Sequence, residues 1–280
     1  MAEKIDELVK KIKELSETEY YKIKIEEEKP ELIDTKIGGL PYWINDKEFP
    51  TDQDGKKLFL LAQINFEKEK TSSPLPSKGL LQFFISDDDL NGVDYDDLIS
   101  QKNFRIVYHE NIDYAITEEI VKELGIKSSV EAECHPVTGE HKISLTKSID
   151  YVTVEDYKFN KLFAQAYKEI YGKEINNEDK YYNILNDEEI KKFEEGLEMN
   201  PNSARHKMLG YAFFTQDDPR YDKKYEDYDT LLFQLDSDGY SNGNGDIILW
   251  GDAGVANFFM KKNDLEKKDF SNVMYNWDCS

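Results

Sequence analysis

The chain has 280 residues, of which 39% are hydrophobic and 13% aromatic, enough for one large domain or two small ones. Its 58 acidic and 36 basic residues leave a formal charge of −22 at pH 7, which argues against nucleic-acid binding and against adsorption to anionic membranes. Two cysteines make no disulfide framework, and neither a signal peptide nor a membrane-spanning run is visible. We therefore expect a soluble, cytoplasmic protein.

The first half of the chain predicts one helix followed by strands. Residues 3–18 repeat apolar side chains at helical spacing, and residues 21–25 alternate apolar and polar side chains as a half-buried strand does. Glycines and prolines make residues 36–57 an ordered loop. Three apolar runs then predict strands, at residues 58–66, 79–85 and 104–108.

Helices are expected in the middle of the chain. Thr117 opens a short helix, and residues 127–154 alternate weakly, which predicts exposed strands. Asp156 and Asp187 are the expected caps of two further helices, the second of which ends before Pro201-Asn202.

One strand pattern occurs twice, in residues 36–90 and 207–265. The first halves of these copies align at a constant offset without a gap, and the alignment pairs Gln63 with Gln234. After four extra residues in the second copy, Phe83-Phe84 meets Phe258-Phe259, and other matches follow in the same order. We infer an internal duplication that produces two similar β units, whose apolar strands pack against each other.

Polar residues in apolar or aromatic surroundings are the candidates for a binding pocket. The amides of Gln63 and Gln234 either satisfy neighbouring backbone groups or face a shared site. Arg220 lies among carboxylates, where a structural ion pair and an anion clamp are both open. Trp250 and Trp277 stand next to acidic residues, as in many ligand pockets. The candidate pocket at the junction of the two copies comprises Gln63, Gln234, Arg220, Trp250, Asp252 and Trp277.

The acidic, Asn/Gly-rich loop 236–246 offers oxygen ligands for a cation. The sixth residue of the loop is Ser241 where an EF-hand needs glycine, and the twelfth position is Ile247 where it needs glutamate. Because the pattern fails, ordinary turn chemistry is the favoured explanation and a cation site is the minor alternative. The weak candidates for cation ligands are Asp236, Asp238 and Asp246.

Signatures of catalysis and of zinc binding are missing. Cys134, His135 and His141 form the single Cys/His cluster, without the second half of a zinc set. The chain has no nucleophile elbow, no His-Glu-x-x-His and no dinucleotide-binding glycine pattern. We therefore assign no catalytic residue, no metal and no cofactor.

The motifs KIGGLPYW, LFLLAQI and LPSKGLLQFF in the first copy are followed by HKMLGYAFFTQDDPR, LLFQLDSD, WGDAGVANFF and DFSNVMYNWDCS in the second. With them, the chain resembles the YwqG-like bacterial family, a domain of unknown function, over about residues 30–280. The resemblance implies a duplicated, mostly antiparallel fold in a cytoplasmic protein. It implies no activity, cofactor or catalytic residue, and some relatives are associated with toxin–immunity systems.

We predict an α+β fold with predominantly antiparallel strands, a duplicated β unit, helices between the copies and an N-terminal helix. An N-terminal helix and strand (residues 1–30) would precede a single duplicated domain (residues 31–280). The leading functional hypothesis is a non-catalytic interaction protein of immunity or regulatory type, whose acidic surface suits a basic protein partner. The alternatives are an enzyme of unrecognised class with a pocket at the junction of the copies, and a small-ligand or cation sensor. The oligomeric state stays open.

Overall fold

A computed structural model describes residues 2–197, 206–239, 243 and 245–279. Ten strands pair in the order β12-β11-β8-β7-β1-β6-β2-β3-β4-β5, and every ladder is antiparallel. The strands from the first part of the chain are β1 (Thr18–Ile25), β2 (Lys36–Gly38), β3 (Phe59–Asn65), β4 (Leu80–Ile85), β5 (Phe104–His109) and β6 (Glu140–Asp150). The later strands are β7 (Lys207–Leu209), β8 (Thr230–Asp236), β11 (Val255–Met260) and β12 (Val273–Asp278). A separate hairpin pairs β9 (Asp238–Gly239) with β10 (Asp246–Ile248).

The strand order confirms the duplication. The ladder between β1 and β6 lies at the centre of the sheet, and four strands extend from each side of it. The first repeat (residues 36–109) adds β2, β3, β4 and β5, and the second repeat (residues 207–278) adds β7, β8, β11 and β12 in the same sequence. Each repeat therefore has one more strand, β5 or β12, than the sequence alignment includes. The alignment misses this strand because β5 and β12 share little besides their apolar character.

The apolar strands of the two repeats pack against each other, as predicted. The ring of Phe83 in β4 stacks on that of Phe233 in β8, with centroids 4.7 Å apart. Where β5 approaches β12, the Phe104 and Tyr275 rings lie 5.1 Å apart, and the N–H of Tyr275 donates to the carbonyl of Leu98 at 2.9 Å. Strands β4, β8 and β11 are buried on both faces or nearly so, which explains their continuous apolar runs.

The outer face of the first repeat is covered by loops and by a short helix that follows the repeat. Tyr42 and Trp43 from the β2–β3 loop pack there with Leu60 and Phe84 of the sheet. Val121 of α2 (Glu118–Glu123) belongs to the same cluster. In the second repeat, α6 (Lys262–Glu266) follows β11 and buries Leu265 in the main core.

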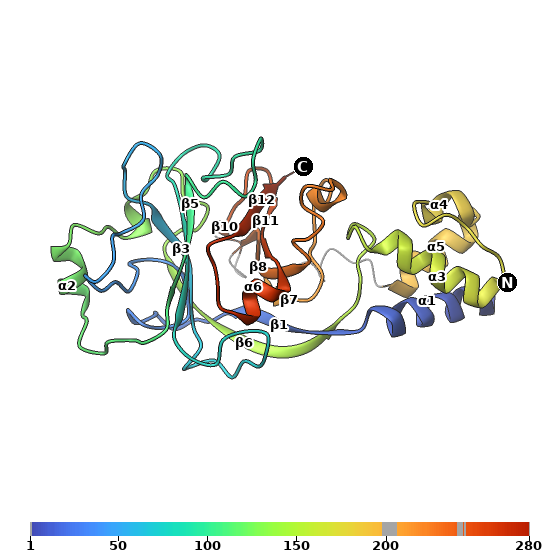
Figure 1. Cartoon of the computed structure of the whole chain (residues 1–280), viewed down its shortest axis with the longest axis horizontal. Coiled ribbons are helices and arrows are strands. Elements are labelled where there is room, and N and C mark those ends of the chain that lie inside the picture. Colours follow the sequence, from blue (N-terminus) through green and yellow to red (C-terminus); the bar gives the residue numbers. More distant parts are fainter. Residues whose placement is uncertain (1, 198–205, 240–242, 244, 280) are drawn as a thin grey trace.

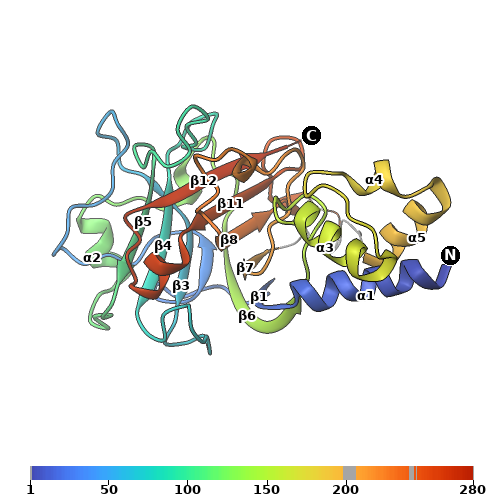
Figure 2. The same ribbon diagram turned by 45° about the vertical axis from the view of Figure 1, so that its right-hand side comes forward.

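The remaining helices form a helical lobe beside the β body, and α1 runs directly into β1 (Figure 1). The lobe consists of α1 (Ala2–Ser16), α3 (Phe159–Tyr171), α4 (Tyr181–Ile184) and α5 (Asp187–Leu197). It has a hydrophobic core of its own, distinct from the core between the repeats. Figure 2 shows α3 and α5 lying over α1. Within the described part of the chain, no helix combines the length and the apolar character that crossing a membrane requires.

The two predicted helix caps differ from the observed ones. Lys158 directly precedes α3; Asp156 lies two residues earlier, where its carboxylate accepts from the N–H of Lys158 at 2.9 Å and also binds the buried Arg220. At α5, the side chain of Asn186 accepts a hydrogen bond from the N–H of Glu189 at 3.1 Å, so Asn186 and not Asp187 caps the helix. The predicted stop at Pro201-Asn202 lies outside the described residues.

Candidate functional site

The two aligned glutamines hold backbone groups at equivalent places. Oε1 of Gln63 accepts a hydrogen bond from the N–H of Tyr42 at 3.1 Å, and its Nε2 donates to two backbone carbonyls at 2.9 Å. Oε1 of Gln234 accepts from the N–H of Phe213 at 2.8 Å, and both side chains are fully buried. Each amide therefore holds the loop between the first two strands of its repeat.

A second amide completes each clamp, and the sequence analysis missed it. Nε2 of Gln82 donates to the carbonyl of Tyr42 at 2.7 Å, and Nδ2 of Asn257 donates to that of Phe213 at 2.9 Å. Both residues of this pair immediately precede matched phenylalanines in the aligned strands, so a signal was present. The N–H and the C=O of one loop residue are gripped in the same way in both repeats.

Arg220 joins the helical lobe to the β body. Its guanidinium donates to Asp218 at 2.7 Å and to Asp156 at 2.9 Å, and all three residues are buried. The Arg220 guanidinium also lies 4.2 Å from the ring centroid of Phe259. Burial opposes the charge, but the two carboxylates outweigh it and raise the pKa of Arg220. Asp156 comes from the segment before α3, so this ion pair ties distant parts of the chain together.

The two tryptophans pack against each other. The ring centroids of Trp250 and Trp277 are 6.0 Å apart, and both side chains are buried. Nε1 of Trp277 donates to the carbonyl of Leu90 at 2.7 Å. Asp252 lies exposed on the turn after Trp250. Gln63 and Gln234 hold loops of different repeats, and of the six candidates Arg220 lines a cavity between the helical lobe and the β body.

The weak cation candidates are dispersed among other contacts. The N–H of Asp236 donates to Nδ1 of His206 at 3.1 Å, and a carboxylate oxygen of Asp238 lies 3.5 Å from Nε2 of the same imidazole. Asp246 is exposed. Among the described residues, no three or more His, Cys, Asp or Glu side chains are grouped so that they could hold a metal ion.

Cys134 and His135 do not form a reactive pair. The exposed thiol of Cys134 donates to Asp89. Desolvation raises the pKa of Cys134 most, and the carboxylates of Asp87 and Asp89 raise it further. Burial lowers the pKa of His135 to about 4, and its Nδ1 accepts a hydrogen bond from the N–H of Val137 at 3.1 Å. A thiol with a raised pKa is a poor nucleophile.

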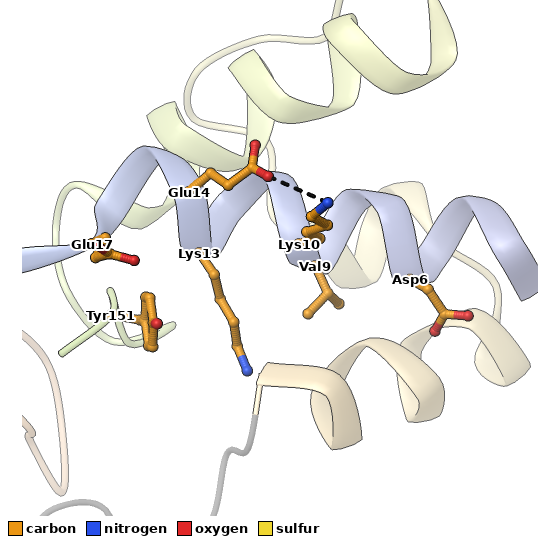
Figure 3. A pocket seen from close by; sticks show the side chains of 7 residues that line it. All are labelled: Asp6, Val9, Lys10, Lys13, Glu14, Glu17 and Tyr151. Carbon is orange, nitrogen blue, oxygen red and sulfur yellow. Dashed lines mark ion pairs between the residues drawn. The ribbon is translucent and has the colours of Figure 1, made fainter. Parts of the chain in front are cut away.

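A hollow of about 380 Å³ lies beside α1 (Figure 3). Lys10 and Glu14 point to one side of the helix, where they form an exposed pair at 3.7 Å. Val9 and Lys13 point to the other side, so the polar groups do not converge. This hollow has the character of a solvated helix surface.

The connection between β4 and β5 forms an acidic segment (residues 87–97) that the sequence analysis did not single out. It contains six aspartates and no basic residue. Two apolar side chains, Leu90 and Tyr95, are exposed within it by 49% and 52%. The segment is held against β12. The Tyr275 hydroxyl donates to the carbonyl of Asn91 at 3.0 Å, and the Tyr95 hydroxyl donates to that of Trp277 at 2.8 Å.

A family model for a domain of unknown function, DUF1963, matches residues 35–279. The chain belongs to this family. The DUF1963 match covers both repeats and the helices between them, while α1 and the central strand β1 precede it. No curated protein matches the chain. The description of the DUF1963 family assigns no activity.

Proposed function

We propose that this DUF1963 protein is a non-catalytic binding protein that holds a basic protein partner on its acidic segment. The observation that carries the proposal is the coincidence of six aspartates with two exposed apolar side chains in residues 87–97. Apolar anchors surrounded by charge are a common composition of protein interfaces, and charge complementarity selects the partner. The YwqG-like resemblance, with its link to toxin–immunity systems, agrees with this role.

The acidic segment is held in shape before any partner arrives. Asp88 accepts hydrogen bonds from the N–H groups of Leu90 at 2.9 Å and Gly92 at 3.1 Å. Asp87 accepts from the N–H of Cys134 at 2.7 Å, which ties the segment to the chain beyond α2. A preformed surface loses little conformational entropy on binding, which favours affinity.

The carboxylates of the acidic segment differ in their internal partners. Asp97 forms an ion pair with Lys224 at 2.9 Å, whereas the carboxylate of Asp96 has no hydrogen bond or ion pair within the described residues; only its backbone N–H donates, to Asp94 at 3.1 Å. Asp89 is exposed, and among the described residues its carboxylate accepts only from the thiol of Cys134. Asp89 and Asp96 are therefore available to a cationic partner, and replacing them leaves the local scaffold in place.

A binding role is also supported by the buried polar groups of the β body. The hydrogen bonds of Gln63, Gln234 and Arg220 described above go to the chain's own backbone and carboxylates. Groups used in this way maintain the fold, whereas a general acid, base or oxyanion donor has to face a substrate.

The test is affinity capture from the native cells, followed by measurement with the purified partner. We compare the chain with D89N/D96N, with L90S and with the charge-matched control E188Q/E195Q on α5, whose side chains are exposed. Wild type and control should recover the same basic protein. The first two variants should each weaken its Kd at least ten-fold, with D89N/D96N also reducing the salt dependence.

Two outcomes would contradict the proposal. One is recovery of the wild-type chain alone under low-salt conditions. The other is a partner that binds D89N/D96N and L90S as tightly as it binds the control, because such a partner uses a different surface.

A further inference from the structure

A cavity of about 340 Å³ lies where the helical lobe meets the β body. It is bounded by the start of β1, the loop between β3 and β4, the segment before α3, and the strand ends of the second repeat. Its polar or charged lining residues include Glu19, Asp156, Lys158, Arg220, Asp229 and Lys262. Its volume is at the lower end of the range of roughly 300–1,000 Å³ that is usual for small-molecule sites.

The cavity exists because the two repeats are covered differently. In the first repeat, the N–H of Gly39 donates to Oγ of Ser129 at 2.8 Å, so a short helical turn closes over this position. The aligned residue of the second repeat is Gly210, which lines the cavity. The helical lobe bridges that side through residues 153–158 and leaves space below them.

The carboxylates of the cavity are already occupied. Asp156 binds Arg220, and Glu19 pairs with Lys147 at 2.7 Å. Asp229 accepts from the hydroxyl of Thr230 at 3.0 Å and from the backbone N–H of Lys262 at 3.1 Å. A cationic ligand would have to compete with these donors.

The two lysine amines of the cavity form no ion pair with any carboxylate of the described residues. Nζ of Lys158 donates to the backbone carbonyl of Asp229 at 3.2 Å, and within the described chain no carboxylate oxygen lies within 4.0 Å of it. Nζ of Lys262 has no hydrogen bond or ion pair with any described residue, although its backbone also contacts Asp229. Burial lowers the pKa of Lys158 more than the nearby carboxylates of Asp156 and Asp229 raise it, and a bound anion would offset the remaining cost.

We propose that this cavity binds a small anionic molecule, whose carboxylate or phosphate group lies between the amines of Lys158 and Lys262. The ion pair of Arg220 with Asp156 forms a fixed wall beside it. The rings of Tyr21 and Tyr211 line the same cavity and provide contact area for the ligand's remaining atoms. The site is independent of the acidic segment and of its protein partner.

The experiment uses three probes of similar size on the full chain. Phenyl phosphate and benzoate carry the two candidate anions, and benzyl alcohol is the neutral control. Calorimetric titration at constant ionic strength should show binding of at least one anion and none of the alcohol. Comparison of the two anions identifies the preferred group, and tighter binding of one makes that group the ligand's headgroup.

Lysine variants locate the site. K158M should weaken binding of the preferred anion at least ten-fold, and K262M should weaken it several-fold, because its amine is more exposed. K127M removes an exposed lysine outside the cavity and should bind like wild type. Circular dichroism and thermal unfolding check that each variant is folded. If K158M does not fold, K262M alone tests the site.

The proposal is overturned if neither anion binds the wild-type chain. It is equally overturned if the folded lysine variants bind the anions as K127M does, since the anion would then be held elsewhere on the surface.

Discussion

The two repeats have equivalent strands, but a position in the loop between their first two strands holds different residues. In the first repeat, Phe49 packs edge-on against Trp43 and Phe84, with ring centroids 4.8 and 5.4 Å apart. The aligned residue of the second repeat is Arg220. Its guanidinium lies 4.2 Å from the ring of Phe259, which is aligned with Phe84, and 5.9 Å from the ring aligned with Trp43. We call the place between these aligned rings (Trp43 and Phe84, or Phe214 and Phe259) the aromatic seat. It holds an apolar ring in the first repeat and a cation in the second.

The covering segments account for this difference. The helical lobe brings Asp156 over the second repeat, and Asp218 comes from the same loop as Arg220. The first repeat is covered by loops and α2, which bring Val121 and Ile126 against the sheet. A buried guanidinium is tolerated only where carboxylates neutralise it, so the lobe decides which residue the seat accepts.

The largest effect is expected from removing the cation. R220M leaves Asp156 and Asp218 buried without a counter-charge and should lower the free energy of unfolding by about 3–5 kcal/mol in urea denaturation. K223M, at an exposed position nearby, should change it by less than about 0.5 kcal/mol.

The triple variant R220M/D156N/D218N sharpens the same comparison. It makes the seat neutral, as in the first repeat, and should recover part of the stability that R220M loses. A loss in R220M no larger than that in K223M would show that the ion pair does not join the lobe to the β body.

A second difference concerns the aligned lysines Lys36 and Lys207. Both are buried, but Nζ of Lys207 pairs with Asp150 at 3.0 Å, whereas Nζ of Lys36 reaches one backbone carbonyl at 3.5 Å. Burial lowers the pKa of Lys36 from 10.5 to about 8, more than nearby carboxylates raise it. The folded protein therefore loses this proton before the unfolded chain does.

This makes an alkaline pH dependence testable. Below pH 8 the charged Lys36 carries its full burial cost, and between pH 8 and 10.5 the unfolded chain binds more protons, so stability rises with pH. The gain from Lys36 is about 3 kcal/mol. K36M should lack this rise and be more stable than wild type at pH 7, whereas K207M should lose about 1.5–3 kcal/mol there. Parallel pH profiles for wild type and K36M would contradict the assignment.

The amide clamps should respond alike in the two repeats. Q63L leaves the N–H of Tyr42 without its acceptor, and Q234L does the same to Phe213, so each should cost about 1–3 kcal/mol. Hydrogen exchange of these two amides should accelerate in the corresponding variant. Q165L, on the exposed face of α3, is the control. An effect at one clamp alone would break their equivalence.

The smallest effect is expected at the apolar seat. F49L keeps the side chain apolar and removes the edge-on ring contacts, so it should cost about 1 kcal/mol. A cost as large as that of R220M would mean that the two seats do not differ in the way the covering segments imply.

The sequence predicted the elements whose burial is periodic. The N-terminal helix, the strands of both copies and the packing of the copies against each other follow from apolar spacing. It did not predict β12, whose Asn276 and Asp278 interrupt the apolar pattern although every residue of the strand is buried. Nor did it place β1 and β6 at the centre of the sheet, because their many exposed side chains are typical of an edge.

Some properties of the candidate residues could be predicted from the sequence, and others depend on the folded chain. Alignment alone related Gln63 to Gln234, and the structure places both in equivalent backbone clamps. The two interpretations of Arg220 were open in the sequence, because its hydrogen-bond partner Asp156 is 64 residues away. Residues 87–97 and Lys158 were not recognised, since exposure and a missing counter-ion are properties of the folded surface.

The sequence by itself determined that this protein is a duplicated, mostly antiparallel α+β chain, because strand burial and repetition depend on the local order of its residues. Only the tertiary structure decided which charges meet, which aspartates stay open to a partner, and where the lobe leaves a cavity. Those features depend on segments far apart in the chain, and the free energy of a buried charge is set by the groups that surround it after folding.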